Sequence, residues 1–132
     1  MEGVTGMEVV EIPPGKALEP EKHMYEKVIY VAEGLGSTEV WRDGQEKRFF
    51  EWGPGGLFAP PLNCWYRLVN GRSERALLAA VTNAPMIIDI FHNEDFIFNC
   101  GYEFKDRYDA QEQFFAEGQT RYQVGRGTYW ET

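Results

Sequence analysis

Two stretches of the sequence decide the fold. Residues 15–34 read GKALEPEKHMYEKVIYVAEG, and residues 55–70 read GGLFAPPLNCWYRLVN. Each stretch starts at a glycine, continues through a polar or proline-containing segment and ends in a run of β-branched and aromatic residues, which is the composition of a strand. Residues 35–54 lie between them, a length that suits a β-hairpin. The two stretches therefore predict neighbouring strands with a hairpin inserted between them.

Turn signals divide the rest of the chain into short segments. They are Pro13-Pro14-Gly15, Glu33-Gly34, Asp43-Gly44, Gly53-Pro54-Gly55-Gly56, Pro60-Pro61, Asn70-Gly71 and Asn83-Ala84-Pro85. The segments between them predict strands near residues 7–12, 27–32, 37–41, 47–50, 56–59, 65–69, 76–82, 87–91 and 96–98. Many short strands at this spacing predict an all-β sandwich or barrel, and Asp43-Gly44 predicts a tight hairpin turn.

One short helix is predicted near the C-terminus. Residues 107–116 are the helical candidate, with Asp106 as the N-cap and Gly118 beyond the end. We expect a single domain over residues 1–117. Residues 118–132 carry glycine, arginine and aromatic residues without clear periodicity, and we expect them to form a tail that docks on a partner subunit. The abrupt aromatic end also fits a piece of a longer protein.

The first stretch has a regular internal spacing. Gly15 is followed after five residues by Glu21-Lys22-His23, after three more by Lys27, and after six more by Gly34. The segment 28–34 reads VIYVAEG, which predicts a strand that closes in a turn.

The second stretch has a spacing of its own. Gly55 is followed after five residues by Pro61-Leu62-Asn63, after two more by Tyr66, and after three more by Asn70. In order and spacing, the two stretches together resemble the paired motifs of the cupin superfamily. The resemblance implies a cupin-type double-stranded β-helix, which is a jelly-roll barrel. The chain resembles a small single-domain cupin, or one half of the gentisate-dioxygenase-like two-cupin proteins.

The resemblance also identifies the positions of a metal site. In metal-binding cupins, three histidines and one glutamate meet inside the barrel, and the matching positions here are Glu21, His23, Lys27 and Tyr66. The ammonium group of Lys27 has no lone pair, so it repels a divalent ion. Glu21 and His23 are the tentative ligands, and His92 would join them only if its strand end crossed the barrel mouth. We expect either no cofactor or a weakly bound Fe, Mn, Ni or Zn ion.

Five residues are predicted to line the ligand pocket. Alternate residues of an extended strand share a face, which directs Glu21, His23, Tyr25 and Lys27 into the barrel, with Tyr66 arriving from a neighbouring strand. Lys27 and Tyr66 are the catalytic candidates. The alternatives are structural: an ion pair between Glu21 and Lys27 would fill the metal position, and Tyr66 would be a packed ring with a satisfied hydroxyl.

Composition and charge narrow the classes of partner. The chain has 132 residues, 13 Lys plus Arg and 21 Asp plus Glu, for a net charge of −8. Such a charge disfavours nucleic acid and anionic membranes. No signal peptide is recognisable, and Cys64 and Cys100 lack CxxC spacing, so we expect reduced thiols and a cytoplasmic location, with a disulfide still an alternative.

The sequence leaves three functions open. The first is a small-molecule-binding domain with a weak or absent metal site, in which Lys27 and Arg67 steer an anionic ligand such as an organic acid. The second is a metal-dependent enzyme, a dioxygenase, isomerase or lyase, which needs at least three protein ligands. The third is a structural, dimerising half of a two-cupin protein. We expect a homodimer, with residues 7–12 and the aromatic tail as contacts.

Overall fold

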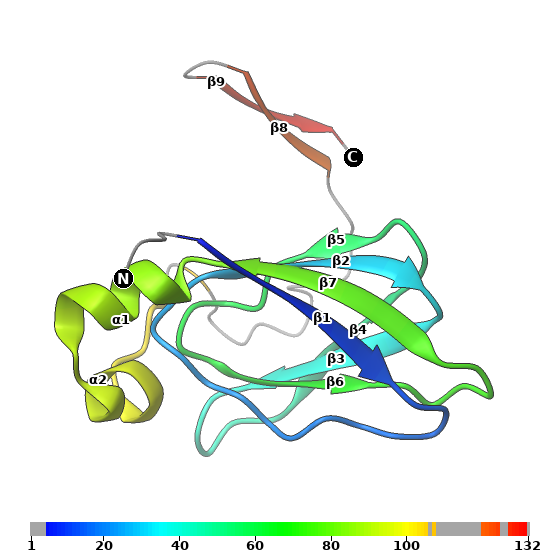
Figure 1. Cartoon of the computed structure of the whole chain (residues 1–132), viewed down its shortest axis with the longest axis horizontal. Helices are drawn as coiled ribbons and strands as arrows, with labels where there is room; N and C mark the ends of the chain where they lie inside the picture. Colours follow the sequence, from blue (N-terminus) through cyan, green and yellow to red (C-terminus); the bar gives the residue numbers. More distant parts are fainter. Residues whose placement is uncertain (1–4, 106, 108–119, 125–126, 132) are drawn as a thin grey trace.

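Two antiparallel sheets, packed face to face, form the body of the protein (Figure 1). The computed structural model describes residues 5–105, 107, 120–124 and 127–131. Sheet A has the strand order β1 (Gly6–Ile12), β7 (Ala76–Thr82), β2 (Lys27–Glu33) and β5 (Leu57–Phe58). Sheet B has the order β4 (Arg48–Trp52), β3 (Gly36–Trp41) and β6 (Trp65–Val69). The predicted jelly-roll class is therefore confirmed.

The core lies between the two sheets and follows the alternation of the strands. In β2, Lys27, Ile29 and Val31 are buried and the residues between them are exposed. Leu78 of β7 and Leu68 of β6 belong to the same buried cluster, so both sheets contribute their inner faces. A one-residue shift in any of these strands would turn its apolar side chains to solvent, which is why the register is well specified.

Glycines of the two motif stretches occupy turns that need a left-handed backbone. Gly34, between β2 and β3, has a φ of 94°, and a Cβ there would lie 2.6 Å from the carbonyl oxygen of Arg75. A larger residue is therefore excluded by both conformation and space. The predicted hairpin is also present: β3 and β4 pair around Asp43-Gly44, and Gly44 has a φ of 75°.

Two buried asparagines hold loops to the barrel. Asn70, at the end of the second motif stretch, is fully buried, and its Nδ2 donates to the carbonyl oxygens of Ile12 (2.9 Å) and Glu74 (2.8 Å). Asn63 has a φ of 54° and donates to the carbonyl oxygens of Cys100 and Tyr102, both at 2.9 Å. Asparagine tolerates this left-handed conformation better than most residues.

Two predicted strands are wrong, because residues 87–91 and 96–98 lie in helices. They belong to α1 (Ala84–Phe91) and α2 (Glu94–Asn99). A short apolar run fits a strand and a helix equally well by periodicity. The deciding signals are capping residues: Pro85 lies in the first turn of α1, and the side chain of Asn93 accepts a hydrogen bond from the amide of Phe96 in α2.

The C-terminal residues that the structure describes form a hairpin of two strands. Among the described residues, β8 (Thr120–Val124) pairs only with β9 (Gly127–Glu131), in a sheet separate from A and B (Figure 1). The sequence signal for it is a pair of short β-forming runs around Gly125 and Gly127. The predicted helix over residues 107–116 lies, apart from Arg107, outside the described residues. None of the described helices is long and apolar enough to cross a membrane.

Candidate ligand site at the barrel mouth

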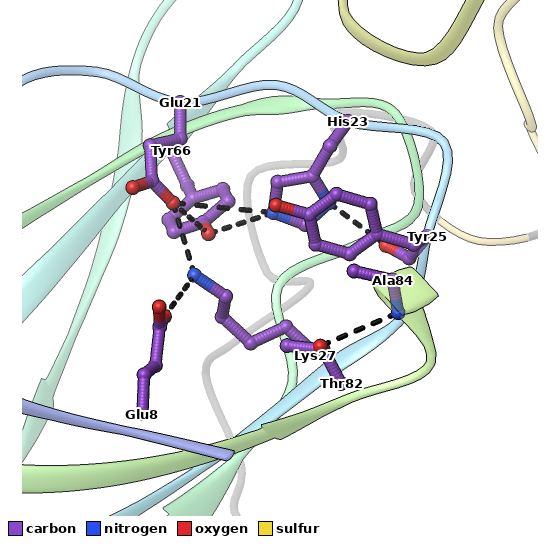
Figure 2. Close-up of polar contacts among 8 residues, drawn as sticks. All are labelled: Glu8, Glu21, His23, Tyr25, Lys27, Tyr66, Thr82 and Ala84. Atoms are coloured by element: carbon purple, nitrogen blue, oxygen red, sulfur yellow. Dashed lines mark hydrogen bonds and ion pairs between the residues drawn. The ribbon is translucent and has the colours of Figure 1, made fainter. Parts of the chain in front are cut away.

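Glu21, His23, Lys27 and Tyr66 converge at one end of the barrel (Figure 2). Lys27 is the first residue of β2, and Tyr66 lies in β6 of the opposite sheet. A short backbone bridge ties the two sides together, because Glu21 and Tyr66 exchange two N–H···O bonds of 2.9 Å. The motif spacing therefore brings together the four positions that it was expected to bring together.

Lys27 lies between two carboxylates. Its side chain is 7% exposed, and Nζ lies 2.7 Å from Oε1 of Glu8 and 3.1 Å from Oε2 of Glu21 (Figure 2). Burial alone would lower the pKa of Lys27, but the hydrogen bond to Glu8 and the charge of Glu21 outweigh it and raise that pKa above its usual value. The amine is therefore a cation at neutral pH.

Close polar contacts link Glu21 to Tyr25 through Tyr66 and His23. The hydroxyl of Tyr66 donates to Oε2 of Glu21 and lies 2.8 Å from Nε2 of His23. Nδ1 of His23 lies 2.8 Å from the carbonyl oxygen of Tyr25, so Nδ1 carries a proton, because a carbonyl can only accept. The rings of His23 and Tyr25 are parallel, with centroids 3.9 Å apart.

The network also changes the proton affinity of its other members. Burial is the largest influence on Glu21 and acts to raise its pKa, but the bond from Tyr66 and the charge of Lys27 together bring that pKa below 4.5. Burial lowers the pKa of His23 below 6.5, and the charge of Lys27 adds to this. Burial and the neighbouring Glu21 raise the pKa of Tyr66 far above its usual value. The hydroxyl is therefore a neutral hydrogen-bond donor near pH 7.

These residues do not fit a divalent metal. The ammonium group of Lys27 occupies the point on which two carboxylate oxygens converge, and it offers no lone pair. Within the described part of the chain, no group of three or more His, Cys, Asp or Glu is arranged to hold an ion. His92 is the C-cap of α1, where its side chain is 74% exposed and lies near Asp89.

The space around the network has two parts. Inside the barrel, a cavity of about 30 Å³ is bordered by Glu8, Glu21, Lys27 and Tyr66, which is room for about two water molecules. Outside it, a groove of about 320 Å³ begins at Glu21. We call it the mouth groove. Its walls include Glu21, Lys22, His23, Tyr25, Trp65 and Phe98. The groove alone is large enough for a small organic ligand.

The structure adds two residues that the sequence interpretation missed. Glu8 supplies the closer carboxylate to Lys27, and Phe98 of α2 forms a wall of the mouth groove. Glu8 was recognisable, because it shares the inward period of β1 with Val10 and Ile12. Phe98 was not, because residues 96–98 were predicted to be a strand. Both cysteines are free thiols, and Cys64 is buried.

We expect acid to destabilise the fold in two steps. His23 keeps a folded-state pKa below 6.5, so the unfolded chain takes up its proton first and stability falls as the pH drops through about 6.5. Glu21 keeps a folded-state pKa below 4.5, so its contribution is present above pH 4.5 and is lost as the pH falls further. Urea unfolding of wild type and His23→Gln between pH 7 and 5 measures the first step.

The other histidine provides the control for this experiment. His92→Gln removes the exposed histidine, whose side chain is 74% exposed, and is measured in parallel. His23→Gln should flatten the slope of stability against pH. A rise in stability from pH 7 to pH 6 in the wild type would contradict the prediction, and would mean that His23 takes up a proton to donate to Tyr66.

Comparisons with known proteins show the fold and nothing finer. The sequence matches no protein-family model and no curated protein. Among solved structures, it is similar to the oxalate decarboxylase of Lactobacillus farciminis, determined as a formate complex, with a TM-score of 0.56, 18% identity, and coverage of 69% of this chain and 32% of that one. The oxalate decarboxylase of Bacillus subtilis, whose Mn(II) centres are described, has a TM-score of 0.56 and 14% identity, with coverage of 70% of this chain and 30% of that one. Tomato vicilin has a TM-score of 0.54 and 16% identity, with coverage of 60% of this chain and 22% of that one.

The fold is thus of the cupin type, one shared by the two oxalate decarboxylases and by the vicilin. The chain spans about a third of the two decarboxylases and about a fifth of the vicilin. At these identities the similarity carries no information about the site, which has to be interpreted from its own residues.

Proposed function

We propose that this domain binds a small organic molecule in the mouth groove and needs no metal to do so. The proposal rests on the unequal volumes of the two spaces at the site, the mouth groove and the cavity inside the barrel. A groove of about 320 Å³ with aromatic walls lies directly outside a barrel whose own cavity is about 30 Å³. Ligand sites are concave, mostly apolar and provided with a few polar groups, as this groove is.

The barrel interior is a poor alternative site. A ligand there would have to displace Lys27 from Glu8 and Glu21, leaving buried charge without a partner. A ligand in the mouth groove meets Tyr25 and Trp65 instead, without breaking any of these contacts. Lys27 and Tyr66, the catalytic candidates, are thus supporting residues that hold the groove in shape.

Binding of probe molecules tests the proposal. Monocyclic probes that differ in charge (benzoate, benzyl alcohol and benzylammonium) are titrated while NMR follows the indole of Trp65 and the ring of Tyr25. We expect at least one probe to bind with a millimolar Kd or better and to lose about tenfold in affinity in Trp65→Leu, because aromatic walls supply most of the contact area. Trp41→Leu is the matched control, since Trp41 stacks on Trp65 but lies outside the groove. Failure of all three probes to perturb either ring would contradict the proposal.

We also propose that two copies pair through the outer face of sheet A. That face exposes large apolar side chains on four strands: Met7 (77%), Val9 (70%), Val28 (42%), Tyr30 (47%), Leu57 (69%) and Val81 (41%). The charges at its edge cancel locally, since Arg75 pairs with Glu11 and Glu33. A two-fold axis places the same patch against itself, and an uncharged patch lets a chain of net charge −8 associate.

Light scattering should give a dimer that Val9→Lys converts to a monomer. A monomeric wild type at micromolar concentration would leave this face to a different partner.

A further inference from the structure

The charges at this end of the barrel favour a ligand of positive charge. Three carboxylates, those of Glu8, Glu19 and Glu21, border the inner cavity against the single ammonium group of Lys27, and Glu21 also lines the mouth groove, together with Lys22. Lys27 is already shared by Glu8 and Glu21, and Arg67 pairs with Glu39, at 2.8 Å between Nη2 and Oε2. The two cations that were expected to attract an organic acid are therefore neutralised by the protein itself.

Glu21 keeps part of its carboxylate available to the groove. Its side chain is 48% exposed, and every polar contact that its carboxylate makes with the described residues uses Oε2 (Figure 2). Oε1 has no hydrogen-bond or ion-pair partner among these residues. A half-exposed carboxylate beside a pocket is an acceptor for an ammonium group and a source of repulsion for another anion.

The groove already holds one cation against an aromatic ring. Nζ of Lys22 lies 5.2 Å from the centroid of Trp65, within the range of a cation–π contact. Lys22 has no ion-pair partner among the residues that the structure describes. Tyr25 and Phe98, on the wall of the same groove, stand edge to face with centroids 6.1 Å apart. The groove is thus lined by three aromatic rings and one carboxylate, and the protein's own Lys22 ammonium group stands over one of these rings, that of Trp65.

We infer that the ligand of the mouth groove is a small organic cation, an alkylated ammonium compound, that takes the place of the Lys22 ammonium group over Trp65. This inference rests on the proposal that the groove binds a small molecule. The Lys22 side chain is long and unpaired, so it can turn into solvent at little cost. Aromatic rings bind alkylated ammonium groups through the negative potential of their faces, and they do so best where water is partly excluded.

A series of probes of equal shape and different charge tests the inference. Choline is compared with its neutral carbon isostere 3,3-dimethylbutan-1-ol and with the anion 3,3-dimethylbutanoate, each titrated against the full chain by NMR. We expect choline to bind at least about tenfold more tightly than the neutral isostere, and the anion to bind most weakly. The shifts should centre on Trp65 and Tyr25.

The sign of the effect at Lys22 gives an independent readout. Lys22→Met should tighten choline binding about three- to tenfold, because it removes a competing cation while keeping the apolar part of the side chain. Lys47→Met is the matched control, because Lys47 stands over Trp41 in the same way, at 4.5 Å, but outside the groove. It should change choline binding by less than about twofold.

The outcomes distinguish a failure of the inference about ligand charge from a failure of the proposed function. If the neutral or the anionic probe binds at Trp65 as tightly as choline, and Lys22→Met weakens that binding, the groove is a ligand site but the inference about charge is overturned. If no probe of either series shifts Trp65 or Tyr25, both the inference and the proposed function are overturned.

Discussion

Replacing Lys27 with methionine is expected to lower the free energy of unfolding by about 2–4 kcal/mol. The substitution keeps the apolar stem but leaves Glu8 and Glu21 facing each other without the cation that lies between them. Removing one partner from a fully buried ion pair costs about 3–5 kcal/mol, and the value here is lower because both carboxylates are about half exposed. Urea unfolding at pH 7 measures the change.

An exposed lysine provides the matched control. Lys47→Met removes an ammonium group that is 53% exposed and 3.9 Å from Glu39, so it should cost less than about 1 kcal/mol. The double variant Lys27→Met/Glu21→Gln should recover part of the loss, because only one carboxylate then remains charged. If Lys27→Met is as stable as Lys47→Met, the ion-pair network does not stabilise the barrel.

We expect Asn70→Ala to lower the free energy of unfolding by about 2–3 kcal/mol. Asn70 is fully buried, and its amide donates to the carbonyl oxygens of Ile12 and Glu74 while its Oδ1 accepts from the amide of Arg72. Alanine would leave these backbone groups without partners, at a cost of about 1–3 kcal/mol for each one that water cannot reach. Thermal and urea unfolding both measure the loss.

An exposed amide side chain provides the control for Asn70→Ala. Gln45→Ala removes an amide from an exposed turn position and should change stability by less than about 0.5 kcal/mol. An Asn70→Ala variant within that same margin would show that solvent replaces the lost bonds, and that the end of the second motif stretch does not fix the loop.

The sequence was most informative where a residue type has a single physical use. Gly34 adopts a backbone conformation that other residues avoid, and the strands 65–69 and 76–82 have the bounds that the turn signals and the runs of β-forming residues predicted. The expected extended strand over residues 21–27 is wrong, because residues 22–26 are irregular and β2 begins at Lys27. Glu21, His23 and Lys27 nevertheless lie together at one end of the barrel, and the suggested ion pair between Glu21 and Lys27 is present. Short periodic patterns and fixed spacings carry this information directly.

The remaining features depend on contacts between distant parts of the chain. The apolar residues 87–91 fit a strand by composition, and the signal that indicates a helix instead is Pro85, a residue typical of the first helical turn. Phe98 reaches the mouth groove because α2 packs beside it, as shown by the bond from the amide of Met24 to the carbonyl oxygen of Ile97 (2.8 Å). No local sequence pattern predicts a contact between such distant residues. The tail that was expected to dock on a partner, the cytoplasmic location and the homodimer stay predictions.

The metal content of the untagged protein tests the central claim most directly, namely that the ammonium group of Lys27 takes the place of a metal ion. The protein is incubated with Fe²⁺, Mn²⁺, Ni²⁺ or Zn²⁺, desalted and analysed for bound metal, in parallel with His23→Ala. We predict less than about 0.2 ion per chain for each metal, and no difference between the two proteins. One ion per chain in the wild type that is lost in His23→Ala would contradict the account.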